Sequence, residues 1–242
     1  MKVLVQGASR GIGLEFVRQL LDRGEEVIAT ARAPDASDGL ARLANRRLRL
    51  ERLDVTEEAD IARVAQGVAD REGRLDILLN VTGILHGPGM RPERRLEDLR
   101  PESLQKAFAV NAIGPALMGK HFRDLLCHGE RAVFASLSAR IGSIADNGLG
   151  GWYAYRASKA AQNQFLRTMA HEFRRKSPEA IVVALHPGTV DTELSKPFQR
   201  SVPKHGLFTV ERAAQQLLEI VDSLRPKESG AFFAWDRQPI PW

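Results

Sequence analysis

The most informative stretch of the chain is Lys2-Val3-Leu4-Val5-Gln6-Gly7-Ala8-Ser9-Arg10-Gly11-Ile12-Gly13. Its first half, residues 2–6, is a β-branched apolar run that predicts a buried strand. Apolar residues recur at helical spacing over residues 14–21 and predict a helix directly after the glycines. In a strand–turn–helix context, glycines let the backbone approach a pyrophosphate, and the free N–H groups of the helix N-terminus favour its charge.

The spacing Gly7-x-x-x-Gly11-x-Gly13 therefore predicts a nucleotide-binding turn. The residues expected to contact the nucleotide are Gly7, Ser9, Arg10, Gly11, Ile12 and Gly13. A glycine-rich turn that binds no ligand is the alternative at this point, because the spacing differs from Gly-x-Gly-x-x-Gly.

A second strand-like run, residues 27–32, bears on which nucleotide is bound. A protein that prefers NAD usually has an acid about 20 residues beyond the glycines, bonded to the ribose 2′-hydroxyl. Here Arg32 occupies that zone, and the first acid after it is Asp35. A guanidinium holds a 2′-phosphate in a forked, charge-assisted contact, and Arg10 would add a second positive charge. The sequence favours NADP(H) over NAD(H); the alternative is that Arg32 merely ends a strand.

Strand and helix patterns alternate along the whole chain. Further strands are expected over residues 48–53, 75–81, 131–138, 181–185 and 231–234, with helical patterns in most of the intervals. This alternation predicts an α/β fold, a doubly wound parallel sheet of about seven strands with helices on both faces. We expect residues 1–242 to form one domain. Ligands of such sheets lie beyond the carboxyl ends of the strands, where Asp54 and the stretch Asn80–Gly83 fall.

Composition narrows the class of protein. An apolar fraction of 43% is typical of a soluble globular chain, and the single cysteine rules out an internal disulfide and fits a reducing compartment. The net charge is +5, but the arginine clusters are dispersed among acids and lack interleaved aromatic residues, so we expect no nucleic-acid partner. No segment is long and apolar enough for a signal peptide or a membrane span, so a cytoplasmic location is expected. The histidines show no metal-ligand spacing, and we expect no metal.

A possible catalytic pair lies in residues 153–159, Tyr153-Ala154-Tyr155-Arg156-Ala157-Ser158-Lys159, which open a long helical pattern. Residues four apart share one face of a helix, so Tyr155 and Lys159 project together. A tyrosine has a pKa of roughly 10, and a nearby cation is expected to lower it toward the working range of an acid or base. On its own, Tyr-x-x-x-Lys is more often a half-buried ring beside a solvated charge.

Three other stretches carry polar residues in unusual places. Asn111 interrupts the apolar stripe of a helix that begins near residue 101, and Ser138 ends the strand over 131–138. The strand over 181–185 closes in a turn, residues 186–192, that begins with His186-Pro187-Gly188. Taken singly, these are read more simply as a bridging core amide and as turn formers.

Together, the pieces resemble the short-chain dehydrogenase/reductase family over essentially the whole chain. The matching residues, in order, are Gly7, Gly11, Gly13, Asp54, Asn80 to Gly83, Asn111, Ser138, Tyr155, Lys159, Pro187 and Gly188. The segments 138–144, 150–156 and 186–192 look more like the carbonyl-reductase and C-factor-like branch. The resemblance implies a Rossmann-type fold and, since the family is commonly dimeric or tetrameric, a homodimer or homotetramer.

The resemblance also implies an NADP(H)-dependent oxidoreductase that interconverts a small-molecule carbonyl, a ketone or aldehyde, and an alcohol. Tyr155 would be the acid/base, Lys159 would lower its pKa and bond the nicotinamide ribose, Ser138 would hold the carbonyl oxygen, and Asn111 would hold a relay water. Further cofactor contacts are expected from Asp54, Val55, Asn80, Gly83, Pro187, Gly188, Val190 and Thr192, besides Tyr155 and Lys159 themselves.

The chain departs from the family pattern in three places. Gln6 stands where the family usually has threonine, and Val81-Thr82 replaces the usual Asn-Ala. Counting back from Gly142, the usual catalytic serine position falls on Ala139, one residue after Ser138. A step of one residue along a strand reverses the face, so a bulge or turn would be needed to re-aim Ser138. Ser143 is the alternative.

Substrate identity is expected to lie in loops 84–100, 140–152 and 189–208. Their apolar residues suggest an apolar pocket; they are Leu85, Met90, Trp152, Leu194 and Phe198. A second class of function is a cofactor-binding signalling or regulatory protein with incidental turnover, as has been assigned to C-factor-like relatives. The presence of Tyr155, Lys159 and Asn111 together favours the enzyme.

Overall fold

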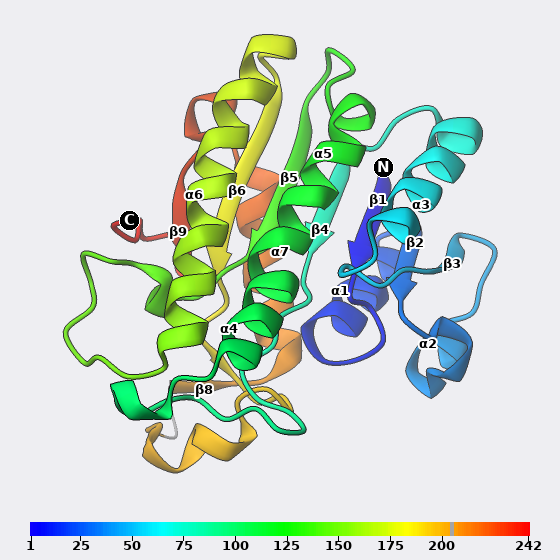
Figure 1. The fold of residues 1–242 in the computed structure, drawn as a ribbon. Helices are drawn as coiled ribbons and strands as arrows, with labels where there is room; N and C mark the ends of the chain where they lie inside the picture. Colours follow the sequence, from blue (N-terminus) through cyan, green and yellow to red (C-terminus); the bar gives the residue numbers. More distant parts are fainter. Residues whose placement is uncertain (204–205) are drawn as a thin grey trace.

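A seven-stranded parallel sheet forms the centre of the structure, a computed structural model that describes residues 1–203 and 206–242 (Figure 1). The strand order is β3-β2-β1-β4-β5-β6-β9. The strands are β1 (Lys2–Gln6), β2 (Glu26–Ala31), β3 (Leu48–Arg52), β4 (Ile77–Asn80), β5 (Ala132–Leu137), β6 (Ala180–His186) and β9 (Phe232–Ala234). The predicted parallel sheet is confirmed, although the strand expected over 75–81 is shorter at both ends. A small parallel pair, β7 (Thr189–Val190) and β8 (Leu207–Phe208), lies apart from it.

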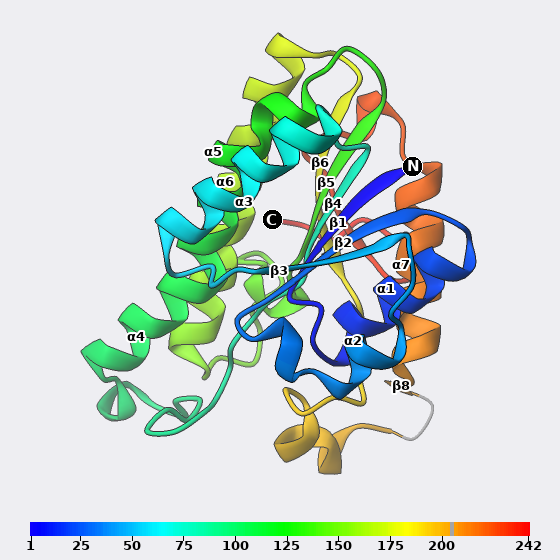
Figure 2. The same ribbon diagram turned by 90° about the vertical axis from the view of Figure 1, so that its right-hand side faces the viewer.

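Helices cover both faces of the sheet, as Figure 2 shows with the sheet seen nearly edge-on. One face carries α1 (Gly11–Asp22), α2 (Asp38–Arg42) and α7 (Val210–Ser223), and the other carries α3 (Glu58–Glu72), α5 (Gly114–Leu126) and α6 (Tyr153–Lys176). Alternate residues of each strand therefore enter different cores: Leu4 packs toward α3, α5 and α6, whereas Val3 and Val5 pack toward α1 and α7. Burial on both faces explains the near-continuous apolar runs of the central strands.

Short helical turns occupy the connections. They are η1 (Pro34–Ala36), η2 (Leu96–Asp98), η4 (Arg140–Gly142), η5 (Lys196–Ser201) and η7 (Pro226–Glu228). Where the sequence predicts one helix interrupted at Asn111, the chain forms α4 (Pro101–Phe108), a single π-helical segment η3 (Ala109–Ile113) and then α5. The extra residue per turn of a π segment rotates the side chains that follow, and such segments occur often at functional sites. Asn111 is 0% exposed inside this segment.

The strand order reverses direction at β1, which pairs with β2 on one side and β4 on the other. The connections leaving β1 and β4 pass to opposite faces of the sheet, so their loops diverge at its carboxyl edge, which is where ligands of such sheets bind. The glycine turn after β1 and the polar stretch after β4 both begin at this edge. The topology therefore predicts where a nucleotide would bind.

Candidate functional site

The glycine turn is held rigidly between neighbouring strand ends. The backbone amides of Gly7 and Ala8 both donate to the Thr30 carbonyl of β2, at 3.0 and 2.9 Å. Gly7 has a φ of +88°, and a Cβ there would lie 2.4 Å from Thr82 Oγ1, so a larger residue is strained and obstructed. In the described part of the chain no side chain caps the N-terminus of α1. The first-turn amides of Gly11–Gly13 are therefore available to an anion.

Two of the departures from the family pattern contact each other. The Gln6 side chain donates to Thr82 Oγ1 at 2.6 Å, and the Thr82 backbone amide donates back to Gln6 Oε1 at 3.2 Å. This reciprocal pair joins the ends of β1 and β4, a contact that neither position alone reveals.

Arg10 and Arg32 are both exposed near the turn, and neither has an ion-pair partner among residues 1–203 and 206–242. Arg32 directly follows β2, the position at which the ribose of a bound dinucleotide is expected. Asp54 follows β3 and uses its carboxylate to accept from the Thr56 amide and hydroxyl, at 3.0 and 2.7 Å. Among the described residues, the two arginines therefore carry positive charge without an ion-pair partner, near the position at which the sequence leads us to expect a 2′-phosphate.

Lys159 is buried against β5 and α6. Its side-chain ammonium donates to the Leu137 carbonyl and to Gln162 Oε1, both at 2.8 Å. It lies 5.9 Å from the centroid of the Tyr155 ring, so the expected juxtaposition on one helix face is present. Burial raises the pKa of Tyr155 to about 12 and lowers the pKa of Lys159 to about 7. The expectation that Lys159 lowers the pKa of Tyr155 is not met by the protein's own groups, because desolvation of the phenolate outweighs the nearby amine.

Asn111 joins three elements through its side-chain amide. Its Oδ1 accepts from the Ile84 amide at 2.8 Å, and its Nδ2 donates to the Ile84 carbonyl at 2.9 Å and to Ser158 Oγ at 3.0 Å. A Cβ on Gly83 would lie 3.6 Å from both Asn111 Oδ1 and Lys159 Nζ. Asn111 and Lys159 therefore converge on Gly83, while the expected relay water stays a prediction.

The two candidate serines differ in what their hydroxyl groups contact. Ser136 bonds to Gln162 and Ser138 bonds to Asn163 Oδ1 at 2.6 Å, so alternation along β5 already places Ser138 on the α6 face without a bulge. The Ser138 hydroxyl proton is used in that bond. Ser143 Oγ accepts from the Asp146 amide at 3.1 Å, and its proton has no acceptor within the described ranges.

The turn after β6 faces the glycine turn. Gly188 has a φ of +78° and lies against the Phe208 ring, which a Cβ would approach to 2.7 Å. A Cβ on Gly11 would lie 3.4 Å from Thr192 Cγ2, so the two turns approach each other. Val190 packs with Ile12 in one apolar cluster. The structure thus brings the turns expected to contact the cofactor to one edge of the sheet.

Aromatic side chains from all three expected substrate loops meet beside Tyr155. Trp152 lies 4.8 Å from Phe198 and 6.3 Å from Tyr155, measured between ring centroids, and His86 lies 5.8 Å from Phe198. Met90, expected in the pocket, is instead buried against Ala107 and Ala154. Leu85 is also buried, at 4% exposure, and residues 204 and 205 of loop 189–208 lie outside the described residues.

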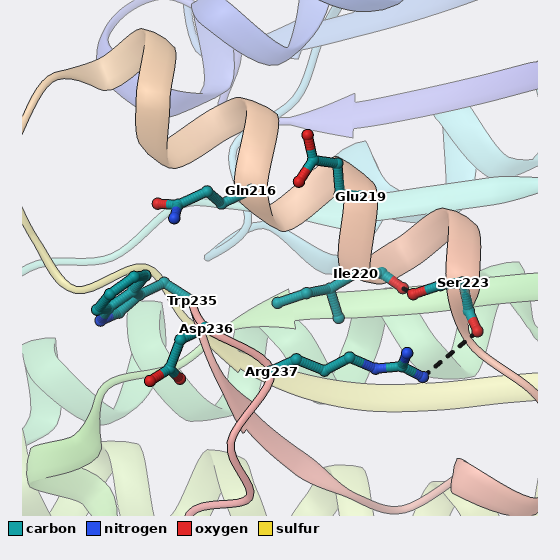
Figure 3. Close-up of a pocket in the computed structure, with 7 residues that line it drawn as sticks. All are labelled: Gln216, Glu219, Ile220, Ser223, Trp235, Asp236 and Arg237. Carbon is teal, nitrogen blue, oxygen red and sulfur yellow. Dashed lines mark hydrogen bonds between the residues drawn. The ribbon is translucent and has the colours of Figure 1, made fainter.

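The pocket in Figure 3 lies elsewhere, between α7 and the turn after β9. Its volume is about 280 Å³, and its lining includes Ile220, Trp235 and Arg237 but none of the expected site residues. The part of the chain that the structure describes contains no group of three or more His, Cys, Asp or Glu side chains placed to hold a metal ion. Within the same ranges, no helix is both long enough and apolar enough to cross a membrane.

Three further residues near the site are not predicted by any motif in the sequence: Gln162, Asn163 and Glu93. Gln162 and Asn163 lie three and four residues beyond Lys159, so helical spacing was a usable signal for them. Glu93 lies in an irregular loop, and no sequence signal connects it to α6. Yet the Trp152 amide donates to the Glu93 carbonyl at 2.6 Å, and the Ala154 amide donates to Glu93 Oε2 at 3.1 Å.

Glu93 therefore holds the first turn of the helix that carries Tyr155. The side chain is 2% exposed, and a carboxylate at a helix N-terminus is favoured by the helix dipole. Trp152, the residue before α6, has a φ of +53°, a conformation that needs such support.

Glu93→Ala is expected to lower the free energy of unfolding by roughly 1–3 kcal/mol, because it removes a helix cap and leaves a void. Glu93→Gln keeps an acceptor for Ala154 and should cost less. Glu97→Ala, in the same loop at 73% side-chain exposure, is the matched control and should change stability by less than about 0.5 kcal/mol. Urea denaturation measures all three; equal costs at positions 93 and 97 would contradict the capping role.

Several known proteins are similar to this chain in both sequence and fold. The family model described as short chain dehydrogenase matches residues 1–202. A 1-hydroxy-2-glutathionyl-2-methyl-3-butene dehydrogenase from Rhodococcus sp. (strain AD45) is 33% identical over 241 residues, 99% of each chain. The C-signal protein of Myxococcus xanthus is 33% identical over 171 residues, 70% of this chain and 94% of that protein.

Two solved structures extend the comparison. The NADPH-bound carbonyl reductase from chicken fatty liver is 30% identical with a TM-score of 0.87, covering 100% of this chain and 98% of that one. A carbonyl reductase from Pseudomonas aeruginosa PAO1 in complex with NADP is 29% identical with a TM-score of 0.80, covering 100% and 99%. The chain therefore belongs to the short-chain dehydrogenase/reductase family of oxidoreductases, in its carbonyl-reductase and C-factor-like branch.

Proposed function

We propose that residues 1–242 act as one NADP(H)-dependent domain that interconverts a ketone or aldehyde and an alcohol. The observation that carries this proposal is the burial of Tyr155 and Lys159 together on one face of α6, where that face meets the carboxyl edge of the sheet. A bound nicotinamide supplies or accepts the hydride. The chain's own residues bind the two reactants and move the proton.

In the reductive direction, Tyr155 donates its hydroxyl proton to the carbonyl oxygen. Burial raises the pKa of Tyr155 to about 12, so the phenol holds a proton to donate at neutral pH. Burial lowers the pKa of Lys159 to about 7. Its ammonium stabilises the phenolate that forms as the proton leaves Tyr155.

The proposed preference for NADP(H) rests on Arg10 and Arg32. Both guanidinium groups lack ion-pair partners among the described residues, so neither has to leave a carboxylate before it contacts a phosphate. The NADPH-bound and NADP-bound structural neighbours support the same choice.

For the residue that holds the carbonyl oxygen, Ser138 is the first candidate and Ser143 the alternative. The Ser138 hydroxyl bonds to Asn163 Oδ1 on the α6 face, and a hydroxyl can rotate to give its proton to a substrate. Ser143 follows Gly142, where a Cβ would lie 2.7 Å from Lys159 Cβ, so η4 packs directly on the helix turn of Lys159.

A cofactor-binding signalling protein is the second candidate, because the C-signal protein matches over 70% of this chain. Such a function needs the nucleotide site but not a proton donor at position 155. The Rhodococcus relative is named for a glutathione-conjugated alcohol, so that class of compound belongs in any substrate test.

Tyr155→Phe is expected to reduce NADPH-dependent turnover by at least about 100-fold, because phenylalanine has no proton to donate. The test panel contains aldehydes, ketones, quinones and a glutathione-conjugated alcohol run in the oxidative direction. Nucleotide binding, followed by NADPH fluorescence, should be nearly unchanged. Full turnover in the variant would contradict the role of Tyr155 as the proton donor. A signalling activity that the variant retains while turnover is lost would favour the cofactor-binding signalling protein.

Arg32→Ala is expected to raise the KM for NADPH by about 10–100-fold, which corresponds to the loss of a charge-assisted contact. The KM for NADH should change little, because NADH has no 2′-phosphate. Arg71→Ala, at an exposed position on α3, is the matched control. An equal rise for both nucleotides would argue against a phosphate contact.

Ser138→Ala is expected to lower kcat by about 10²–10³-fold, the usual cost of removing a hydrogen bond to a developing oxyanion. Ser143→Ala should mainly lower stability, by roughly 1 kcal/mol, through its lost bond to the Asp146 amide. Parallel measurement of kcat and of urea unfolding separates the two serines. The reverse pattern would assign the substrate-holding role to Ser143.

A further inference from the structure

The Gln162 side chain contacts Lys159 from the next turn of α6, three residues further along the helix. It is 0% exposed, and its Oε1 accepts from Lys159 Nζ at 2.8 Å. Its Nε2 donates to Ser136 Oγ at 2.7 Å and to the Leu137 carbonyl at 3.2 Å. Every polar atom of this buried amide therefore has a partner.

The orientation of the amide follows from its partners. The Leu137 carbonyl only accepts hydrogen bonds, and an ammonium only donates them. The nitrogen of Gln162 must therefore face β5, and its oxygen must face Lys159. A flipped amide would place two acceptors together and two donors together.

Gln162 also connects Lys159 to the end of β4. Ser136 Oγ accepts from Asn80 Nδ2 at 2.8 Å as well as from Gln162. Asn80 Oδ1 is buried without a partner among the described residues, at a strand end expected to contact the cofactor. A continuous chain of uncharged side chains, joined by hydrogen bonds, thus runs from the expected cofactor site to Lys159.

Among residues 1–203 and 206–242, the surroundings of Lys159 are otherwise uncharged. The neighbours that the packed elements bring to it are Leu137 from β5, Gly83 from the loop after β4, Asn111 from η3, Gly142 from η4, and Tyr155 and Gln162 from α6. Tyr155 is the ionisable member of this set. Burial alone lowers the pKa of Lys159, with no contribution from a charged group. Neutral acceptors, not a counter-ion, therefore stabilise the ammonium form.

We propose that Gln162 is a positioning residue that keeps Lys159 in its ammonium form and directs its remaining N–H toward Tyr155 and the nicotinamide ribose. Two of the three ammonium protons are committed, to Leu137 and Gln162. One proton is left for the reactive side of the site. This assignment rests on the proposed function for its catalytic consequence, but the contact with Lys159 does not depend on it.

The first test is the pH dependence of kcat. Activity that needs the Lys159 ammonium is lost as the pH rises through the pKa of Lys159. Gln162→Met removes the hydrogen-bond acceptor and keeps a side chain of similar length. The basic limb of the profile, where kcat falls as the pH rises, should therefore move to lower pH by about one unit. Gln162→Glu supplies a negative acceptor, so the limb should move to higher pH.

Gln164→Met is the matched control, because Gln164 is exposed on the same helix and, among the residues that the structure describes, bonds only to Thr168. Its profile should match that of the wild type. Damage to packing alone would not move the limb in opposite directions for methionine and glutamate. Shifts of the same sign in both variants, or none, would overturn the proposal.

A second measurement needs no turnover. In protein labelled with ¹³C,¹⁵N-lysine, the Lys159 side-chain shifts report its titration directly, with Lys159→Arg providing the assignment. The wild-type midpoint is expected near 7, and Gln162→Met should lower it by about one unit. An unchanged midpoint would overturn the role of Gln162. Loss of the proposed function would appear instead as absent turnover with a normal titration shift.

Discussion

Burial of the Lys159 ammonium between β5 and α6 is the constraint on which the rest of the site depends. A charge removed from water is destabilised by several kcal/mol unless hydrogen bonds replace its hydration. The Leu137 carbonyl and Gln162 supply two of these bonds. The close approach of the elements also requires Gly142, because any Cβ there would lie 2.7 Å from Lys159 Cβ.

The parallel sheet brings the residues expected to contact the nucleotide to the same region as this buried lysine. Since all the strands point the same way, their carboxyl ends deliver polar residues to a single edge, although those residues are far apart in the sequence. The glycine turn, Gly83 and Thr192 reach that edge from three different strands. Asn111 adds a fourth contribution, because the π-helical segment places it inside the core beside the loop after β4.

Periodicity was sufficient to predict the seven strands and their parallel arrangement, because apolar runs and helical stripes are local properties of the chain. Contacts between distant residues were not predictable in that way. The Gln6–Thr82 pair and the Glu93 cap depend on how loops pack, which no local pattern encodes. The predicted shift of the Tyr155 pKa, a lowering, is wrong for a related reason. The spacing shows that a lysine is near, but it does not show how completely both groups are removed from water.

An ammonium held by neutral acceptors behaves differently from one held in an ion pair. A carboxylate partner would keep Lys159 charged far above neutral pH and would compete with Tyr155 for its protons. With neutral partners, burial lowers the pKa of Lys159 to about 7. Under the proposed function, a hydrogen bond from a bound ribose would favour one of the two forms, and the protonation state of Lys159 would then depend on nucleotide binding.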